Sequence, residues 1–376
     1  MNRTTVNRII PIVMAAAAIT LTATIVLGII DGTLTGGSPI TSGQSVFAAG
    51  GSTLQVDEDL EGGILVIADP ATEIRVLDPA DASERGRIEL GREPATITPT
   101  PGGVSVFVTF PDTEEIEVYS TTEFEHETTI APEGGDGRTP EDLTFSENGD
   151  TLFVTWRDSD AVSVFSHSML GLSFRYEFAT PDAHGPLYRN RRATRLYRGS
   201  GSGIEIYFAQ NGEHIDTITL PGEQADNEAW VFNARHTHLW GTDASGNPIV
   251  VDEAASSARE IDISASPEIA PVIPADTEHA LYVDAAQTGV FAFDARSGNR
   301  LADVTFSEKV LDELGGRIAR IVDTGAGPVW AIGVSGKIAA VDPATLSIAD
   351  VHDAGARETV MAVSSIVQQD GNFACF

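Results

Sequence analysis

Apolar and polar positions repeat along this chain with a period of about 44 residues. A short apolar segment occurs seven times, and successive copies begin 42, 46, 44, 43, 42 and 48 residues apart. The copies are Ile64–Ala68, Val106–Phe110, Leu152–Trp156, Leu196–Ser200, Leu239–Asp243, Leu281–Ala285 and Val329–Gly333. Each is followed by a polar turn and a second segment, such as Ile116–Ser120, in which apolar residues alternate with small or polar ones. A period of two predicts strands with one face more buried than the other.

Two further strands complete each unit. Arg87–Leu90 and Leu301–Phe306 exemplify the third strand, and Pro94–Thr98 and Pro140–Phe145 exemplify the fourth. Four strands per unit, seven times over, predict an all-β fold, a seven-bladed β-propeller over residues 53–376. The longest spacing contains Ser307–Gly315, which predicts a short capped helix between two blades.

The repeat is similar to that of a known family. Phe107-Val-Thr109 and Phe153-Val-Thr155 resemble the YVTN/YncE-like β-propeller repeats, and the resemblance covers about residues 64–367. Repeats four and five depart from it, with Tyr197-Arg-Gly and Trp240-Gly-Thr. The family implies a seven-bladed and often exported fold without one fixed chemistry.

Ring closure requires a strand from the far end of the chain. Glu358–Val367 is the predicted innermost strand of the first blade, and residues 53–57 are a weaker candidate for the same place.

The amino terminus predicts a membrane tether. Residues 1–8 form a basic cytoplasmic segment, and residues 9–30 form an apolar run that would cover about 33 Å as a helix, enough to cross a bilayer. The charge order predicts a signal anchor with the propeller outside the cytoplasm, and residues 31–52 read as a flexible linker. A cleaved signal peptide is the alternative, with Val46–Ala48 as its cleavage site, and the propeller would then be secreted.

Composition narrows the set of partners. The formal charge of −32 argues against binding nucleic acid. Adaptation to a salty or cation-rich setting is the alternative to a specific cation-binding role. The one cysteine, Cys375, excludes an intramolecular disulfide and a multi-thiolate metal site within the chain.

When the strands of a blade are counted outward from the innermost one, the connections into the first strand and the turns between the second and third strands are expected to open on one face, around the mouth of a central channel. Most blades place an acid there, and together these acids could hold a divalent cation such as Ca²⁺. Turns favour Asp for structural reasons as well, so the acids alone do not establish a site. The predicted ligand-binding residues are Glu93, Asp142, His184, Glu228, Glu268, Arg317 and Glu358.

Two other features could have a function. A basic stretch at the opposite, lower turn of the fourth blade predicts an interaction patch toward the membrane or an acidic partner, or else ion pairs with the protein's own acids. Its residues are Arg189, Arg191, Arg192, Arg195 and Arg198. His236 and His238 are spaced as a strand-borne metal pair would be, but their place at the lower turn, next to Trp240, favours a turn or edge pair.

Function is less determined than fold. The sequence favours a membrane-tethered extracytoplasmic scaffold that binds a cation, a peptide or a protein. The alternatives are a lactonase-type or other metal-dependent propeller enzyme and a metal-binding chaperone. No nucleophile elbow or phosphate loop is present, and no catalytic residue or cofactor is assigned.

Overall fold

The computed structural model divides the chain into two units, Met1–Glu58 and Asp59–Phe376. In the first unit, β1 (Val46–Phe47) pairs antiparallel with β2 (Thr53–Leu54). The structure describes residues 46–47, 53–54 and 64–366, the last range without 70–71, 79–80, 102, 133–136, 147, 158, 169–170, 182, 191–192, 201–202, 223–229, 234–235, 275–276, 324–327 and 354–361. The domain boundaries expected from the sequence stay predictions.

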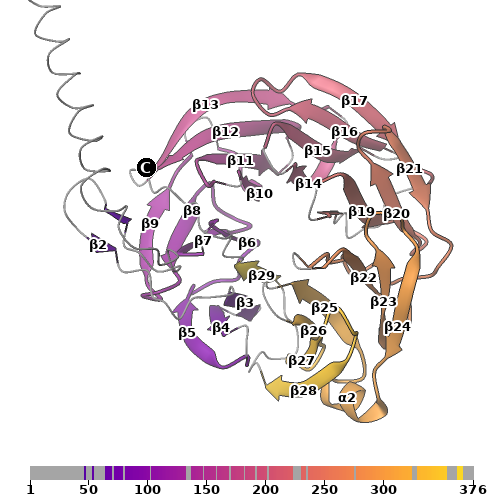
Figure 1. Ribbon diagram of the computed structural model, residues 1–376. Helices are drawn as coiled ribbons and strands as arrows, with labels where there is room; N and C mark the ends of the chain where they lie inside the picture. The colour runs from indigo at the N-terminus through magenta and orange to yellow at the C-terminus, as the bar shows by residue number, and fades with distance from the viewer. Residues whose placement is uncertain are drawn as a thin grey trace, which may run out of the picture. The chain divides into compact units, whose positions relative to one another are not determined.

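Six four-stranded antiparallel sheets make up most of the described part of the second unit. Figure 1 shows the sheets in a ring, with β6, β10, β25 and β29 toward the centre. Three of the sheets, each from the inside outward, are β29 (Ala362–Ile366), β3 (Ile64–Asp69), β4 (Glu73–Leu77) and β5 (Glu84–Glu89); β6 (Thr96–Pro99), β7 (Ser105–Thr109), β8 (Ile116–Ser120) and β9 (His126–Ile130); and β10 (Pro140–Phe145), β11 (Thr151–Trp156), β12 (Ala161–Ser168) and β13 (Gly171–Ala179).

The other three four-stranded sheets follow the same order. They are β14 (His184–Arg189), β15 (Arg195–Ser200), β16 (Gly203–Phe208) and β17 (His214–Thr219); β18 (Val231–Phe232), β19 (His238–Thr242), β20 (Pro248–Asp252) and β21 (Ser257–Glu260); and β25 (Ile318–Asp323), β26 (Val329–Gly333), β27 (Lys337–Val341) and β28 (Ile348–Asp353). This arrangement is an all-β propeller, as the repeat predicts.

The carboxyl-terminal part of the chain closes the first sheet. β29 pairs antiparallel with β3, and Ile366 faces Ile64. The predicted closing strand, 358–367, is therefore confirmed over Ala362–Ile366, whereas Thr53 and Leu54 pair with β1 instead. One sheet thus joins the two ends of the ring, and β29 covers the inner edge of β3.

One sheet departs from the predicted pattern. β22 (His279–Val283), β23 (Gly289–Asp294) and β24 (Arg300–Thr305) form a three-stranded sheet. The segment on its inner side makes only isolated bridges, Ala265 with Asp284 and Val272 with Leu281. Prolines supply no backbone donor and interrupt a strand at this place; they are Pro267, Pro271 and Pro274. The described residues thus contain six complete blades of four strands, and the prediction of seven complete blades is not met.

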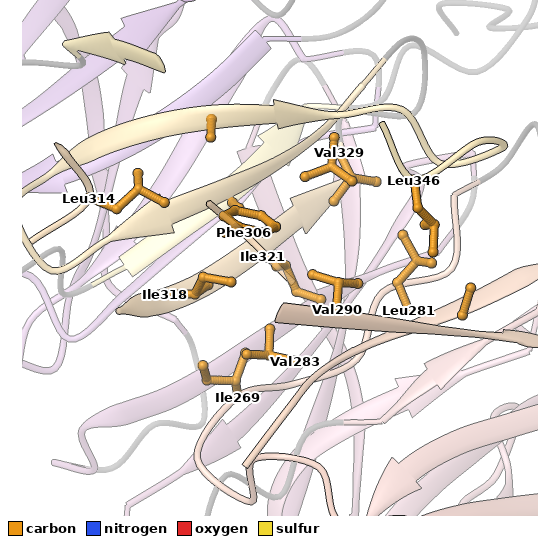
Figure 2. Close-up of a cluster of buried hydrophobic side chains, with 14 residues drawn as sticks. Ile269, Leu281, Val283, Val290, Phe306, Leu314, Ile318, Ile321, Val329 and Leu346 are labelled. Carbon is orange, nitrogen blue, oxygen red and sulfur yellow. The ribbon is translucent and has the colours of Figure 1, made fainter. Parts of the chain in front are cut away.

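The hydrophobic core lies between successive sheets. Figure 2 shows one cluster, in which Leu281 and Val290 of the three-stranded sheet pack with Ile318, Ile321 and Val329 of the next sheet. Another cluster joins Leu77 of β4 to Trp330 of β26 and so packs the last sheet against the first. These contacts remove apolar side chains from water and hold neighbouring sheets together.

The turn between third and fourth strands has a recurring form. In the β27–β28 turn, Leu346 has a positive φ of 55° and donates from its N–H to the carbonyl of Asp342 at 2.8 Å. The Asp342 carboxylate accepts the N–H groups of Ala344 and Thr345 at 2.8 and 3.0 Å. Asp294 caps the β23–β24 turn in the same way. Part of the acidity of this chain therefore serves turn formation.

The helix predicted from the sequence is present. α2 (Glu308–Glu313) has Ser307 as its N-cap, and Ser307 Oγ accepts the N–H of Val310 at 3.4 Å. Gly315 follows the helix with a positive φ of 84°. The capping residues thus lie where the sequence places them.

The predicted membrane anchor, residues 9–30, lies outside the described residues. Within the described ranges, no helix has the length and apolar character needed to cross a bilayer.

Candidate functional site

The upper face is defined here as the end of the ring where the connections enter the innermost strands and the second strands turn into the third. Antiparallel order places these connections and turns at the same end of every sheet. Glu93, Glu268 and Arg317 lie in them with exposed side chains. His184 begins β14, but its side chain is not among the described ones, and Glu228 and Glu358 lie outside the described residues. The predicted set is thus located only in part.

Asp142 differs from Glu93, Glu268 and Arg317 because it lies in a seam between two sheets, where β10 and β14 meet. Its Oδ2 accepts the backbone N–H of Leu187, on β14, at 3.2 Å. Its own N–H donates to Thr155 Oγ1 at 3.1 Å. Both inner strands are irregular at this point, with register shifts between Pro140 and Asp142 on β10 and between His184 and Leu187 on β14. Such bulges re-aim side chains at strand ends.

Burial governs the ionisation of Asp142. The residue keeps partial exposure, but protein atoms crowd its carboxylate, and this desolvation raises its pKa to about 6. The N–H groups of Leu187 and Leu143 lower the pKa, the negative charge of Glu141 raises it, and Arg198 lowers it. Near neutral pH the protein therefore keeps this carboxylate ionised at an energetic cost.

Arg198, on β15, is the cation of the same seam. It is only 2% exposed. Its Nε donates to the carbonyl of Gly185 at 3.2 Å and its Nη1 to Thr180 Oγ1 at 2.6 Å. Burial lowers the pKa of its guanidinium, and the charges of Glu141, Asp160 and Asp142 oppose that effect. Proteins tolerate a buried guanidinium when its N–H groups find hydrogen-bond acceptors, as those of Arg198 do here.

The strand register explains why this seam is unusual. Asp142 pairs with Thr155 in the way that Thr96 pairs with Thr109 in the preceding sheet. The sheet of Arg198 likewise has a charged residue where preceding sheets have buried valines: Arg198 faces Leu187, as Val154 faces Leu143 and Val108 faces Ile97. One acid and one base thus replace a threonine and a valine of the repeat, on the two sides of one seam.

A second group joins Glu268 and Arg317. Gln287, in the β22–β23 turn, donates from Nε2 to Glu268 Oε2 at 2.9 Å and to Ser266 Oγ at 3.2 Å. Its Oε1 accepts from Arg317 Nη1 at 3.3 Å, and its carbonyl accepts the N–H of Ile318 at 2.8 Å. The structure therefore brings two of the predicted residues together through a residue that the sequence did not single out.

Other acids of this face are paired with arginines. Arg92 contacts Glu117 at 2.7 Å and Asp112 at 3.7 Å and covers the ring of Phe110. Arg138 contacts Glu177 at 2.5 Å. The predicted acidic ring is thus partly neutralised, whereas the carboxylates of Glu93 and Glu141 stay exposed.

The three described members of the predicted arginine patch do not form one surface. Arg198 is buried in the seam described above, which corrects its assignment to the lower turn. Arg195 pairs with Glu253 at 2.7 Å, and Arg189 donates to the carbonyl of Phe145. Arg191 and Arg192 lie outside the described residues. The described members serve contacts within the protein, because each finds an acceptor nearby.

The histidine pair separates in a similar way. His236 stacks on Phe232 with ring centroids 5.3 Å apart, and His238 lies 3.9 Å from Asp252. Among the described residues, no group of three or more His, Cys, Asp and Glu is arranged to hold a metal ion.

Sequence reasoning assigned Arg198 to the lower patch and not to the seam beside Asp142, and it missed Gln287. Arg198 could have been found as a charged residue at a position that is Val108 and Val154 in other repeats. Gln287 left no such signal, because its role depends on a positive φ of 59° that aims it at neighbouring segments.

No family model and no curated protein matches this chain. Among solved structures, it is similar to apo AztD from Citrobacter koseri, with 11% identity, a TM-score of 0.60 and coverage of 81% of this chain and 98% of that one. It is also similar to the dihydro-heme d1 dehydrogenase NirN in complex with DHE, with 11% identity, a TM-score of 0.56 and coverage of 78% and 75%. These similarities show that the chain shares the propeller fold.

Proposed function

We propose that this chain is a binding module whose upper face takes a positively charged segment of a partner protein. The observation that carries the proposal is the exposure of Glu93, Glu141 and Glu268 where three sheets open on the same face. Carboxylates in solvent attract a cationic partner over a distance and hold it by several weak ion pairs. The net charge of −32 adds to that attraction.

The fold is consistent with such a role. One of the two similar structures is a complex with a ligand, DHE. At 11% identity this similarity supports a shared fold and does not identify a ligand of the present chain.

The finer architecture that we propose is a seven-bladed propeller of the YVTN/YncE-like kind. The three-stranded sheet would be the remaining blade, with segment 265–272 as its irregular inner edge. The N–H of Leu281 donates to Val272 at 2.8 Å, and that of Val272 donates back to Leu281 at 3.1 Å, which supports this count. The motifs Phe107-Val-Thr109 and Phe153-Val-Thr155 support the family assignment.

We also propose that residues 9–30 tether the propeller to a membrane, outside the cytoplasm. The support is the apolar run and the charge order around it. The full chain should fractionate with membranes, and residues 50–376 should stay in the soluble fraction. A mature protein that begins near Ala49 would instead identify a cleaved signal.

The binding role can be tested with the full chain and a lysine-rich decapeptide, by calorimetry at two salt concentrations. The triple variant Glu93→Gln, Glu141→Gln and Glu268→Gln should weaken binding about tenfold at low salt, because each exposed ion pair contributes about 0.2–1 kcal/mol. The matched control neutralises three exposed acids at the opposite turns, Glu123→Gln, Glu125→Gln and Glu213→Gln. It changes the net charge equally and should retain binding.

Equal losses in the two triple variants would mean that net charge alone attracts the peptide, and the proposal would be wrong. Binding of Ca²⁺ or Zn²⁺ by the full chain, abolished by the upper-face variant, would favour the metal-dependent enzyme or the metal chaperone instead.

A further inference from the structure

The seam between β10 and β14 is held through both backbone polar groups of one residue, Leu187. The N–H of Leu187 donates to Asp142 Oδ2 at 3.2 Å, and its carbonyl accepts from Thr144 Oγ1 at 2.8 Å. In the preceding seam, Thr96 Oγ1 and Thr98 Oγ1 donate to the carbonyls of Glu141 and Leu143 at 2.7 and 3.5 Å. Both seams use side chains of the inner strand, but only the β10–β14 seam uses a group that can change its charge.

Several elements around Asp142 carry charged or titratable residues. Glu141 is its neighbour on β10, and Arg198 lies across the seam on β15. Asp160, in the β11–β12 turn, acts on Arg198. Thr155 of β11 is a neutral partner, and His184 begins the strand that carries Leu187. Any pH response at this seam must therefore be assigned between Asp142, Glu141 and His184.

We propose that Asp142 makes the seam between β10 and β14 pH-responsive, so that the two inner strands hold together more tightly when its carboxyl is protonated than when it is ionised. The protonated carboxyl still accepts the N–H of Leu187 through its carbonyl oxygen. Protonation also removes a negative charge that is desolvated and that repels the neighbouring charge of Glu141. The ionised form keeps the attraction of Arg198 but loses solvation, and the loss is the larger effect.

The direction follows from linkage. A carboxyl whose pKa in the folded chain, about 6, exceeds its ordinary value of 3.8 binds its proton more tightly when folded. Its contribution to stability is therefore fully present below the unfolded value and is lost as the pH rises through about 6. Carboxyls with lowered pKa values act in the opposite direction at lower pH, so the effect of Asp142 must be isolated by difference.

The test is hydrogen exchange of the full chain, followed by mass spectrometry in peptides that cover 184–190 and corrected for the intrinsic pH dependence of exchange. In the wild type we expect about tenfold weaker protection at pH 7.5 than at pH 5. In Asp142→Asn, which keeps the acceptor oxygen and removes the titration, protection should differ little between the two pH values. Peptides from the Thr96–Glu141 seam provide the internal reference.

Three further variants separate the contribution of Asp142 from those of its neighbours. Asp142→Thr installs the residue that stands at Thr96, and it replaces the Asn variant if that variant does not fold. His184→Gln and Glu141→Gln should keep the pH response of the wild type. An unchanged response in Asp142→Asn and Asp142→Thr, or a response that disappears in His184→Gln, would overturn the proposal.

Discussion

Arg317 and Glu268 are joined through the side chain of Gln287, which accepts from Arg317 at 3.3 Å and donates to Glu268 at 2.9 Å. The three residues come from three different segments of the upper face. Gln287 reaches them because its backbone has a φ of 59°, a conformation that a non-glycine residue adopts at a cost of about 1–2 kcal/mol. The side-chain amide of Gln287 thus holds the segments together, while the left-handed backbone conformation of the same residue costs conformational free energy.

This opposition predicts the effect of two substitutions. Gln287→Ala removes the amide and keeps the strained backbone, whereas Gln287→Gly removes both. We expect the glycine variant to be more stable than the alanine variant by about 1 kcal/mol in chemical denaturation. Equal stability of the two variants would show that the backbone carries no strain at this position.

Much of the fold is readable from the sequence because the signal is periodic. The apolar segment Leu152–Trp156 is β11 within one residue, and Ser307 caps α2 as expected. The incomplete sheet was the exception. Its inner segment contains Pro267, Pro271 and Pro274, and the loss of backbone donors there outweighs the repeat.

The site was less predictable, because strand periodicity does not show how far a long side chain reaches. Arg195 and Arg198 are close in sequence and both basic, yet Arg195 pairs with Glu253 while Arg198 is buried in the seam beside Asp142. The useful signal was the departure from the repeat, where a charged residue takes the place of a valine. Local rules tend to fail where a protein has other demands on a residue.

The pair of Asp142 and Arg198 should behave as a coupled unit. Arg198→Met at pH 8 removes the hydrogen bonds to Gly185 and Thr180 and a favourable charge near the ionised Asp142, and we expect a loss of about 1–3 kcal/mol in the free energy of unfolding. In the double variant with Asp142→Asn the interaction between the two charges is absent, so its loss should be smaller than the sum of the two single losses. A double-mutant cycle by urea denaturation measures this coupling.

The coupling should also depend on pH. At pH 5 the carboxyl of Asp142, whose pKa is raised to about 6 by desolvation, is mostly protonated, so the cycle should show a much smaller interaction energy than at pH 8. An interaction of the same size at both pH values would contradict the proposed charge state.

The turn cap at Asp342 gives a prediction of the opposite sign. The N–H groups of Thr345 and Ala344 lower the pKa of its carboxyl below the ordinary value of 3.8. The stability that this carboxylate contributes is therefore present above that value and is lost as the pH falls below it. Asp342→Ala should reduce the free energy of unfolding at pH 7 by about 1 kcal/mol, and this deficit should shrink near pH 2.5, as urea denaturation at the two pH values would show.

The control for this cap is Asp342→Asn, which keeps an acceptor oxygen and should lose less stability at pH 7. An equal loss in both variants would mean that the cap does not act through these hydrogen bonds.

The departure of repeat five from the other repeats of this chain has a steric cause that can be tested. Gly241 stands where other repeats have Val108 and Val154, and a Cβ atom there would lie 2.4 Å from Cε3 of the buried Trp230. Gly241→Val should therefore destabilise the protein by about 1–3 kcal/mol or more through overpacking. Trp230→Ala alone should cost about 3–5 kcal/mol through the cavity that it leaves. In the double variant the new valine fills part of that cavity. Denaturant unfolding should therefore show a smaller loss of stability in the double variant than the sum of the losses in the two single variants. Additive losses would show that Gly241 and Trp230 do not compete for the same space, and the missing valine of this repeat would need another explanation.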